Sequence, residues 1–436
     1  MALKQVILGT HFPGVNHNTV WSDPEAGSQI EFASFERFAQ TAERGKLDFL
    51  FLAEGLRLRE QRGRLHDLDV VGRPNTLVVL AALAAVTSRI GLAGTLNATF
   101  NEPYNLARQL ASLDILSAGR AAWNVVTSPG AFTGENFRRG AYLPHSERYE
   151  RAREFVALAR HLWEGGDDGE GGFDYQGKQF DIRGRLQTGA LPQGQPVIFQ
   201  AGDSNDGREF AAASADAIFT RHGSLEKGQA FYRDVKDRLP KYGRADHALK
   251  ILPGVGVVLG DTPEEAADNY ARVRRQQVSP QTALVLLEQL WNRDLSAYDP
   301  DGPLPDIEPD VSESTVARGR TRQYDDTLET ARRWREIAQR DKLSIRELII
   351  HVTGRQDFVG TPAQVADDIN HYVQSDASDG FILVPHLIPS GLEGFVDRVV
   401  PLLQEKGVFR QDYTGLTLRD HLGLPVSSQV KPEAVA

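Results

Sequence analysis

Short apolar runs alternate with longer amphipathic stretches along the whole chain, and this alternation is the strongest constraint on its fold. Eight of the runs read as strands: residues 6–9, 49–53, 90–95, 121–127, 197–201, 217–220, 251–259 and 380–384. Several are nearly continuous in apolar residues, which is typical of parallel strands covered by helices on both faces. Eight strand–helix units predict a closed (β/α)8 TIM barrel of the α/β class, with a doubly wound open sheet as the alternative.

The stretches between the strands carry helix signals. Apolar residues recur three and four positions apart in residues 30–44, 74–88, 103–116, 146–163, 206–214, 225–239, 262–274 and 361–374. Thr262-Pro263-Glu264-Glu265 and Thr361-Pro362-Ala363-Gln364 each place a capping threonine before a proline at the first helical position. A helix is therefore expected after nearly every strand.

The chain is longer than a plain barrel requires. It has 436 residues, whereas a barrel of this type needs roughly 250, so we expect a single domain over residues 1–436 that carries insertions. Residues 165–191 are rich in Gly and Asp and predict a hairpin or loop. Residues 276–324 contain Asp-Pro-Asp-Gly-Pro-Leu-Pro, which interrupts any helix or strand, and predict a long excursion that is a candidate lid. Residues 410–436 are expected to form a C-terminal tail.

Charge and composition argue against several classes of protein. The 49 Lys and Arg against 59 Asp and Glu give a formal net charge of −10, unlike the basic surface of a nucleic-acid-binding protein. No apolar run approaches the ~18 residues of a membrane span. The absence of Cys excludes disulfides, thiolate metal sites and cysteine nucleophiles, and it is consistent with a cytoplasmic location.

Candidate functional residues lie just after the expected strands, because the active site of such a barrel forms at the C-terminal ends of its strands. They are His11, Glu54, Thr95, Asn124 and the turn Gly202-Asp203-Ser204-Asn205. The histidines show neither His-x-His nor His-Glu-x-x-His spacing, so no metal site is expected. Gly-x-Ser-x-Gly is also absent, which leaves a serine hydrolase without support.

Two of these segments allow two interpretations each. The turn from Gly202 to Gly207 precedes a helix, so its backbone N–H groups could bind a phosphate, or its side chains could simply cap the helix. His145 and Tyr149 are four residues apart on one helical face. They are either a pair of donors to a ligand or a cap and a packed ring, and spacing alone favours the second interpretation.

One run identifies a family. Asn101-Glu102-Pro103-Tyr104-Asn105 and Trp123-Asn124-Val125-Val126-Thr127-Ser128 resemble segments of the bacterial luciferase-like, flavin-dependent monooxygenases. The resemblance is to the branch that contains nitrilotriacetate monooxygenase and dibenzothiophene-sulfone monooxygenase. It extends over almost the whole chain and includes residues 43–45, 48–54, 94–104, 145–149, 195–202, 360–362 and 379–381.

This resemblance implies the fold, the reaction and the partners. Members of the family are (β/α)8 barrels that take reduced FMN from a separate NAD(P)H:flavin reductase and use O2 to insert one oxygen atom into a small organic substrate. The reaction passes through a flavin peroxide, at C4a or at N5. Relatives form homodimers or homotetramers. Substrates in this branch include amines, aminopolycarboxylates, sulfones, sulfides and halogenated aromatics, and the sequence does not choose among them.

The resemblance also implies individual roles. Thr95 and Asn124 correspond to contacts with the polar edge of the isoalloxazine ring, and Tyr149, Gly202 and Ser204 to contacts with the FMN phosphate. His145 is expected near the phosphate or the ribityl chain. Glu54 occupies a position where relatives usually have Asp, which weakens its assignment as a flavin contact. His11 is the candidate catalytic residue, facing the reactive edge of the flavin, with a structural role as the alternative.

Some further expectations follow. Asp203 stands where many relatives carry Ser, and because a carboxylate repels a phosphate we expect it to turn away and cap the helix. His222 and His351 are further candidates for the substrate pocket. Phe12, Trp21, Phe100 and Trp123 are either apolar walls around a substrate or ordinary core. Two alternative functions remain: a deazaflavin-dependent hydride-transfer oxidoreductase on the same fold, and a non-catalytic flavin-binding protein.

Overall fold

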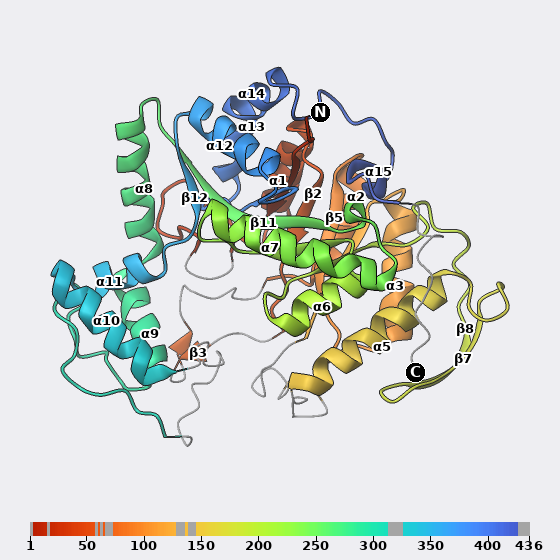
Figure 1. Cartoon of the computed structure of the whole chain (residues 1–436), viewed down its shortest axis with the longest axis horizontal. Coiled ribbons are helices and arrows are strands. Elements are labelled where there is room, and N and C mark those ends of the chain that lie inside the picture. Colours follow the sequence, from red (N-terminus) through yellow and green to blue (C-terminus); the bar gives the residue numbers. More distant parts are fainter. Residues whose placement is uncertain are drawn as a thin grey trace.

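A computed structural model describes residues 3–14, 18–56, 60–61, 64–65, 73–127, 136–137, 145–312 and 326–425. Eight parallel strands form its centre: β1 (Ile7–His11), β2 (Phe49–Leu52), β5 (Gly91–Asn97), β6 (Ala121–Val126), β9 (Val197–Gln200), β10 (Ala217–Thr220), β11 (Lys250–Leu259) and β13 (Gly380–Leu383). They pair in this order, and β13 returns to β1. The sheet is therefore a closed (β/α)8 barrel, as predicted, and not a doubly wound open sheet (Figure 1).

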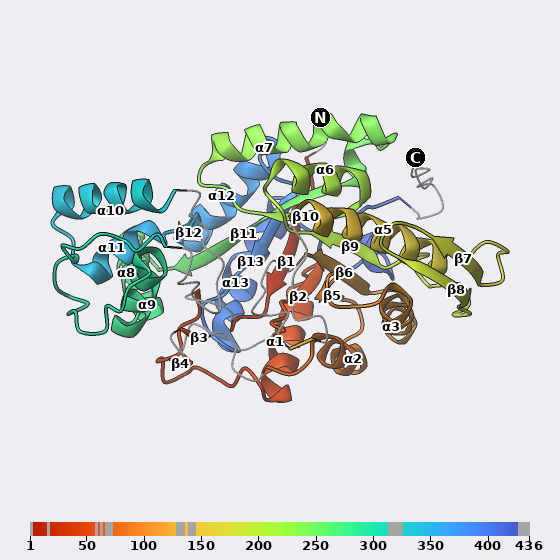
Figure 2. The same ribbon diagram turned by 90° about the horizontal axis from the view of Figure 1, so that it is seen from below.

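Helices surround the barrel (Figure 2). They are α1 (Phe32–Arg44), α2 (Thr76–Val86), α3 (Pro103–Leu116), α5 (His145–Trp163), α6 (Asn205–Ser214), α7 (Leu225–Arg238), α8 (Pro263–Gln277) and α12 (Pro362–Gln374). Thr361 and Gln364 form a capping box at the start of α12, which satisfies two backbone donors that the helix itself leaves unpaired. Shorter elements complete the chain: β3 (Glu60–Gln61), β4 (Arg64–Leu65), η2 (Leu239–Tyr242), η3 (Asp246–Ala248), η4 (Ser390–Leu392), α13 (Glu393–Arg398), α14 (Val400–Glu405) and α15 (Leu418–His421).

The barrel interior is packed with apolar side chains toward the N-terminal ends of its strands. One buried cluster contains Phe49, Phe51, Ala93, Ala122 and Phe199, together with other inward-facing residues. Side chains alternate between the two faces of a strand. The positions two residues beyond Ala93 and Ala122 therefore also face inward, and they are Thr95 and Asn124. The interior thus changes from apolar to polar toward the C-terminal ends of the strands.

Two insertions lie on opposite sides of the barrel (Figures 1 and 2). Residues 165–191 contain an antiparallel hairpin of β7 (Gly172–Gln176) and β8 (Asp181–Arg185). Between β11 and β12 (Asp357–Gly360) the chain forms α9 (Pro280–Trp291), α10 (Thr327–Asp341) and α11 (Ile345–Val352). These three helices share an apolar cluster of their own, separate from the barrel core. The segment 276–324 therefore includes a helix, α9, that the sequence analysis did not identify, and residues 313–324 lie outside the described residues.

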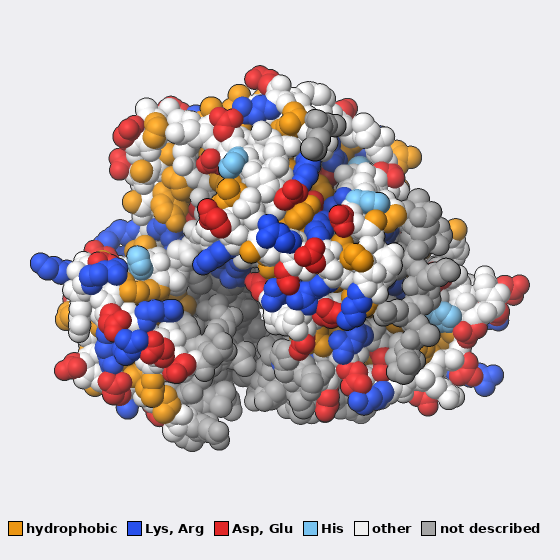
Figure 3. Space-filling view, viewed as in Figure 1, with side chains coloured by type: hydrophobic (Ala, Val, Ile, Leu, Met, Phe, Trp, Pro, Cys, Tyr) orange, Lys and Arg blue, Asp and Glu red, His pale blue; other side chains and the backbone are white. Residues whose placement is uncertain are grey.

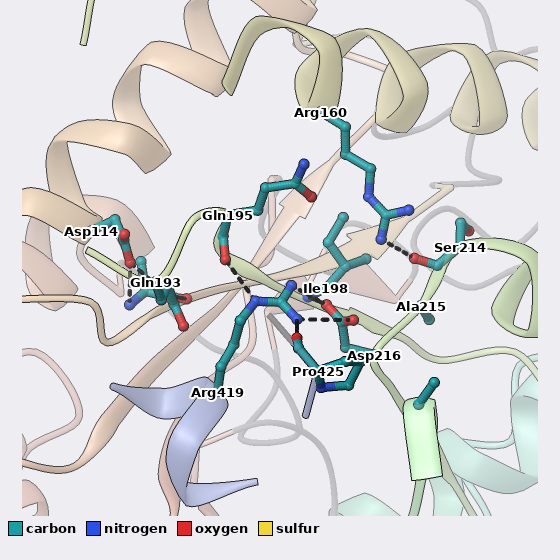
Figure 4. Close-up of polar contacts among 12 residues, drawn as sticks. Asp114, Arg160, Gln193, Gln195, Ile198, Ser214, Ala215, Asp216, Arg419 and Pro425 are labelled. Atoms are coloured by element: carbon teal, nitrogen blue, oxygen red, sulfur yellow. Dashed lines mark hydrogen bonds and ion pairs between the residues drawn. The ribbon is translucent and has the colours of Figure 1, made fainter. Parts of the chain in front are cut away.

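The segment that was expected to be a tail is fixed to the barrel over its described part, residues 410–425. Leu418 and Leu422 belong to the apolar cluster of the barrel interior. Arg419 donates from Nη2 to Asp216 Oδ2 at 2.9 Å and from Nε to the carbonyl of Gln195 at 3.1 Å (Figure 4). Arg419 and Asp216 are 5% and 3% exposed, so this ion pair is buried. Residues 426–436 lie outside the described part of the chain.

The described surface carries both signs of charge. On the face shown in Figure 3, Lys and Arg side chains lie among Asp and Glu over α7 and over the helical insertion α9–α11. None of the described helices is long and apolar enough to cross a membrane.

Candidate active site

An inward-facing polar pair lies at the C-terminal ends of β5 and β6. Thr95 and Asn124 are direct partners in the register of the two strands. Asn124 donates from Nδ2 to Thr95 Oγ1 at 3.0 Å, and the two residues are 3% and 7% exposed, respectively. The second polar atom of the Asn124 side chain, Oδ1, is buried and has no partner among the described residues. A buried acceptor without a donor is costly, so this position fits a ligand N–H group.

The turn between β9 and α6 forms a second candidate contact. Ser204 is the N-cap of α6, and its hydroxyl accepts a hydrogen bond from the Gly207 N–H at 3.1 Å. A Cβ atom at Gly202 would lie 3.1 Å from Gly207 Cα and 3.2 Å from the hydroxyl oxygen of Tyr149, and it would collide with Gln200 Nε2. The structure thus brings Tyr149, Gly202 and Ser204 to one helix N-terminus, where a bound anion is favoured.

Asp203 differs from the expectation that it caps the helix. The cap is Ser204, and Asp203 instead accepts a hydrogen bond on Oδ1 from Thr220 Oγ1 at 2.7 Å. Thr220 is the last residue of the neighbouring strand β10. The interaction joins two adjacent loops at the C-terminal end of the barrel, and the sequence did not reveal it because the two residues meet only when the strands pair.

His11 ends β1, and its ring stacks on Phe51 with ring centroids 5.6 Å apart. Burial, together with the positive charges of Arg73, Arg355 and Arg221, lowers the pKa of His11 to about 3. The imidazole is therefore neutral near pH 7. Its Nδ1 atom is buried without a partner among the described residues, which leaves it able to meet a ligand.

Glu54 lies two residues after β2, beside the N-terminus of α2. Asn75 donates to Glu54 Oε1 from Nδ2 at 3.3 Å. Burial raises the pKa of Glu54 to about 7, and a hydrogen bond from the Thr76 backbone only partly opposes this effect. A substantial part of the Glu54 population is thus protonated at neutral pH, which is unusual for a glutamate.

Replacing Glu54 by Gln is expected to change how stability depends on pH. The pKa is higher in the folded than in the unfolded protein, so the folded state binds more protons between pH 4.5 and 7, and stability falls as the pH rises through this range. Between pH 5 and pH 8 the Glu54→Gln protein should therefore lose about 1–2 kcal/mol less of its unfolding free energy than the original protein does. Urea unfolding at pH 5 and pH 8 measures the difference. Equal pH dependence in the two proteins would show that Glu54 is normally solvated.

The remaining predicted residues are placed as follows. The backbone of His145 begins α5, but its side chain is outside the described structure. His222 is buried after β10, with its ring 5.1 Å from that of Phe231, whereas His351 is exposed on α11. Among the described residues, no group of three or more His, Asp or Glu side chains is arranged to hold a metal ion.

Two aromatic residues are core rather than substrate walls. Phe12 stacks on Phe35 with ring centroids 4.2 Å apart, in the layer between the barrel and its helices. Trp123 alternates with the inward-facing Ala122 and Asn124, so it faces outward, where its Nε1 donates to the Leu96 carbonyl at 3.0 Å. The wall role predicted as one option for these two residues is therefore wrong. Trp21 and Phe100 remain predictions.

The sequence analysis did not single out Arg73, whose Nη2 donates to the Pro13 carbonyl two residues after His11, or Arg355, and the charges of both arginines lower the pKa of His11. Neither residue directly follows a barrel strand: Arg73 precedes α2 and Arg355 precedes β12. The one local signal was Arg73-Pro74, an arginine just before an expected helix. Such a pair is common at helix starts and carries no functional meaning without the fold.

Comparison with known proteins gives consistent matches. Residues 11–379 match the family model described as luciferase-like monooxygenase. The chain is 41% identical to N-acetyl-S-(2-succino)cysteine monooxygenase of Bacillus subtilis (strain 168), over 98% of this chain and 99% of that protein. It is 39% identical to nitrilotriacetate monooxygenase component A of Aminobacter aminovorans, over 98% and 97% of the two chains.

The fold comparison agrees. The crystal structure of a riboflavin lyase with a modified FMN and its substrate riboflavin superimposes with a TM-score of 0.77 and 29% sequence identity. The match covers 97% of both chains. The similarity therefore extends over the barrel and its insertions, and not over a single motif.

Proposed function

Because this chain belongs to the luciferase-like monooxygenase family, we propose that it is the FMNH2-dependent oxygenase component of a two-component system. It is a flavin-dependent monooxygenase, as its relatives are. We propose reduced FMN as its cofactor and a separate NAD(P)H:flavin reductase as its partner. The observation that carries the proposal is that the barrel has both an inward-facing buried acceptor without a partner among the described residues, Asn124 Oδ1, and a helix N-terminus at Ser204.

The residues at these two places fit the two ends of FMN. The turn from Gly202 to Ser204 would hold the phosphate through backbone N–H groups at the start of α6, with the Tyr149 hydroxyl beside it. Thr95 and Asn124 would hold the polar edge of the ring, and the Oδ1 atom of Asn124, which has no partner among the described residues, would accept a ring N–H. Flavin supplies, when bound, the electrons that activate O2.

The protein contributes position and exclusion of water. Apolar side chains such as Phe51 and Phe199 fill the barrel directly beneath the polar layer, so the floor of the site is dry. The neutral imidazole of His11 can donate or accept a hydrogen bond at this floor without bringing in a charge. We keep the segment 276–324 as the candidate lid. In its described part, Gln277 Nε2 donates to the Asn18 carbonyl at 2.5 Å, in the loop after β1.

The relative named component A supports a two-component system. A separate reductase requires that reduced FMN reach this protein by diffusion, which in turn requires a site that opens. We further propose a cytoplasmic location, where NAD(P)H is available to the reductase, and a homodimer or homotetramer. The deazaflavin and non-catalytic alternatives fit less well, because relatives at 41% and 39% identity are named monooxygenases.

Two substitutions test the phosphate site. Tyr149→Phe and Ser204→Ala should each weaken the binding of reduced FMN by about 1–3 kcal/mol, since each removes a hydroxyl that would serve a charged group. Anaerobic fluorescence titration measures the affinity. Ser204 also caps α6, so Ser224→Ala, which removes the equivalent cap of α7, is the matched control for lost stability. Unchanged affinity in both site variants would show that the phosphate lies elsewhere.

A further inference from the structure

Gln200, the last residue of β9, places a polar side chain in an apolar layer. Val197 and Phe199 belong to the apolar cluster of the barrel interior, whereas Ile198 belongs to a cluster that includes residues of α5 and α6. Because side chains alternate along a strand, Gln200 points the same way as Ile198, toward those two helices. Gln200 is only 3% exposed. Its amide is therefore buried where the preceding position on the same face is apolar.

The Gln200 amide forms no hydrogen bond with a described residue, and its Oε1 atom is fully buried. The two other buried glutamines of the described chain differ in this respect. Gln193 donates from Nε2 to Asp114 Oδ1 at 2.6 Å. Gln195 donates from Nε2 to Glu164 Oε1 at 2.6 Å. Since burying a polar group without a hydrogen bond costs stability, the Gln200 amide fits a group whose partner is a ligand.

This amide lies beside the N-terminus of α6. A Cβ atom at Gly202 would collide with Gln200 Nε2. The same Cβ atom would lie 3.2 Å from the Tyr149 hydroxyl oxygen and 3.1 Å from Gly207 Cα. One side of Gly202 is therefore surrounded by the amide, the hydroxyl and the first turn of α6. All three supply hydrogen-bond donors, and such a set of donors fits an anion.

The charged side chains of this turn do not themselves attract an anion. Asp203 and Asp206 are both acidic, and Asp206 lies in the first turn of α6. Arg208 donates from Nη1 to Asp234 Oδ2 at 2.7 Å, so its positive charge is neutralised within the protein. Within residues 202–208, an anion would therefore be held by donors that carry no charge. The amide of Gln200 adds a donor of this kind.

We propose that Gln200 donates from Nε2 to the phosphate of reduced FMN and makes this protein select FMN over riboflavin. The proposal rests on the proposed function and adds a specificity-determining residue to that same site. Riboflavin has the same ring system without the phosphate, so its binding leaves the buried amide without a partner. A site built to form a hydrogen bond rejects a ligand that lacks the partner group.

A binding role and a structural role of Gln200 predict opposite effects on stability. Gln200→Met keeps the approximate size of the side chain and removes an amide that has no partner among the described residues. The melting temperature of the ligand-free protein should therefore stay the same or rise. Gln193→Met is the matched control. It removes an amide that donates to Asp114 and, at 2.8 Å, to the Ala121 carbonyl, so it should lower the melting temperature.

The test is anaerobic fluorescence titration of each protein with reduced FMN and with reduced riboflavin. We expect the original protein to bind reduced FMN at least tenfold more tightly than reduced riboflavin. Gln200→Met should weaken the binding of reduced FMN at least tenfold and change that of reduced riboflavin less than twofold. Gln200→Glu should weaken the binding of reduced FMN further, because it adds a carboxylate beside the phosphate. Gln193→Met should keep the ratio of the two dissociation constants within twofold of the original.

Three outcomes overturn the proposal and leave the proposed function standing. In the first, Gln200→Met binds reduced FMN within twofold of the original protein. In the second, it loses affinity for both flavins equally, which means that the amide acts on the ring or on the shape of the site. In the third, it lowers the melting temperature as much as Gln193→Met does and keeps its flavin affinity, which means that its role is structural. If the original protein binds neither reduced flavin, the proposed function itself fails.

Discussion

Replacing Arg419 by Ala should lower the free energy of unfolding by about 3–5 kcal/mol, the usual cost of breaking a buried ion pair from one side. Asp216 would remain 3% exposed without its main partner. Burial acts to raise the pKa of Asp216, but the positive charges of Arg419, Arg160 and Arg244 outweigh it and hold the pKa below its ordinary value. Asp216 also accepts the Ile198 N–H on Oδ2 at 2.9 Å, so the pair joins the C-terminal segment to β9 and β10 (Figure 4).

Urea unfolding followed by circular dichroism measures this loss. The matched control is Arg332→Ala, because Arg332 pairs with Glu329 and Glu336 on the exposed face of α10, where solvent screens an ion pair and it contributes little to stability. The depressed pKa of Asp216 gives a second check. Its stabilising effect is complete above the ordinary pKa of an aspartate and is lost as the pH falls below it, so Arg419→Ala should destabilise less in acid. Equal losses of unfolding free energy in Arg419→Ala and Arg332→Ala would show that the buried ion pair of the C-terminal segment stabilises the protein no more than an exposed pair does.

Replacing Gly202 by Val should weaken the binding of reduced FMN about a hundredfold or more, or roughly 3 kcal/mol. The first added carbon would already lie 3.2 Å from the Tyr149 hydroxyl oxygen and 3.1 Å from Gly207 Cα. The two methyl groups of Val must then occupy the space between this turn and Tyr149, which is where the phosphate is proposed to lie. Anaerobic titration with reduced FMN gives the affinity.

Gly202→Ala is the graded companion to this substitution. The single added carbon is crowded, but small shifts, chiefly of the Gln200 amide, make room for it. We therefore expect a loss of affinity for reduced FMN that is smaller than that of Gly202→Val. Thermal unfolding separates a filled site from a damaged fold. A Val variant that unfolds at the original temperature and binds reduced FMN normally would place the phosphate away from β9.

Much of the fold could be predicted from the sequence. All eight barrel strands and the helices that follow most of them lie within a few residues of their predicted positions, because burial on both faces leaves continuous apolar runs that local inspection detects. The strand β12 was missed, since its four residues, Asp357 to Gly360, include only two apolar side chains. Helix α9 was missed because the proline-rich stretch after it predicted a long excursion over the whole of residues 276–324.

The candidate site was only partly accessible from the sequence. Thr95 and Asn124 were identified by their place after a strand and by the family resemblance, but their direct pairing depends on the register of β5 and β6. Ser204 was correctly one of the possible caps, whereas the partner of Asp203 lies on another strand. Arg73 shows the limit most clearly, because no residue near it in the sequence indicates that it lies close to the segment that follows His11.

The sequence by itself determined which segments become strands and helices, because the period of apolar residues follows from local backbone geometry. Only the tertiary structure decided which polar side chains share one end of the barrel and which apolar ones, such as Phe12 and Trp123, are buried outside it. It also decided that Arg419 neutralises Asp216 from 203 residues away. The reason is that strand register and barrel closure fix contacts between residues distant in the chain, and no local pattern encodes them.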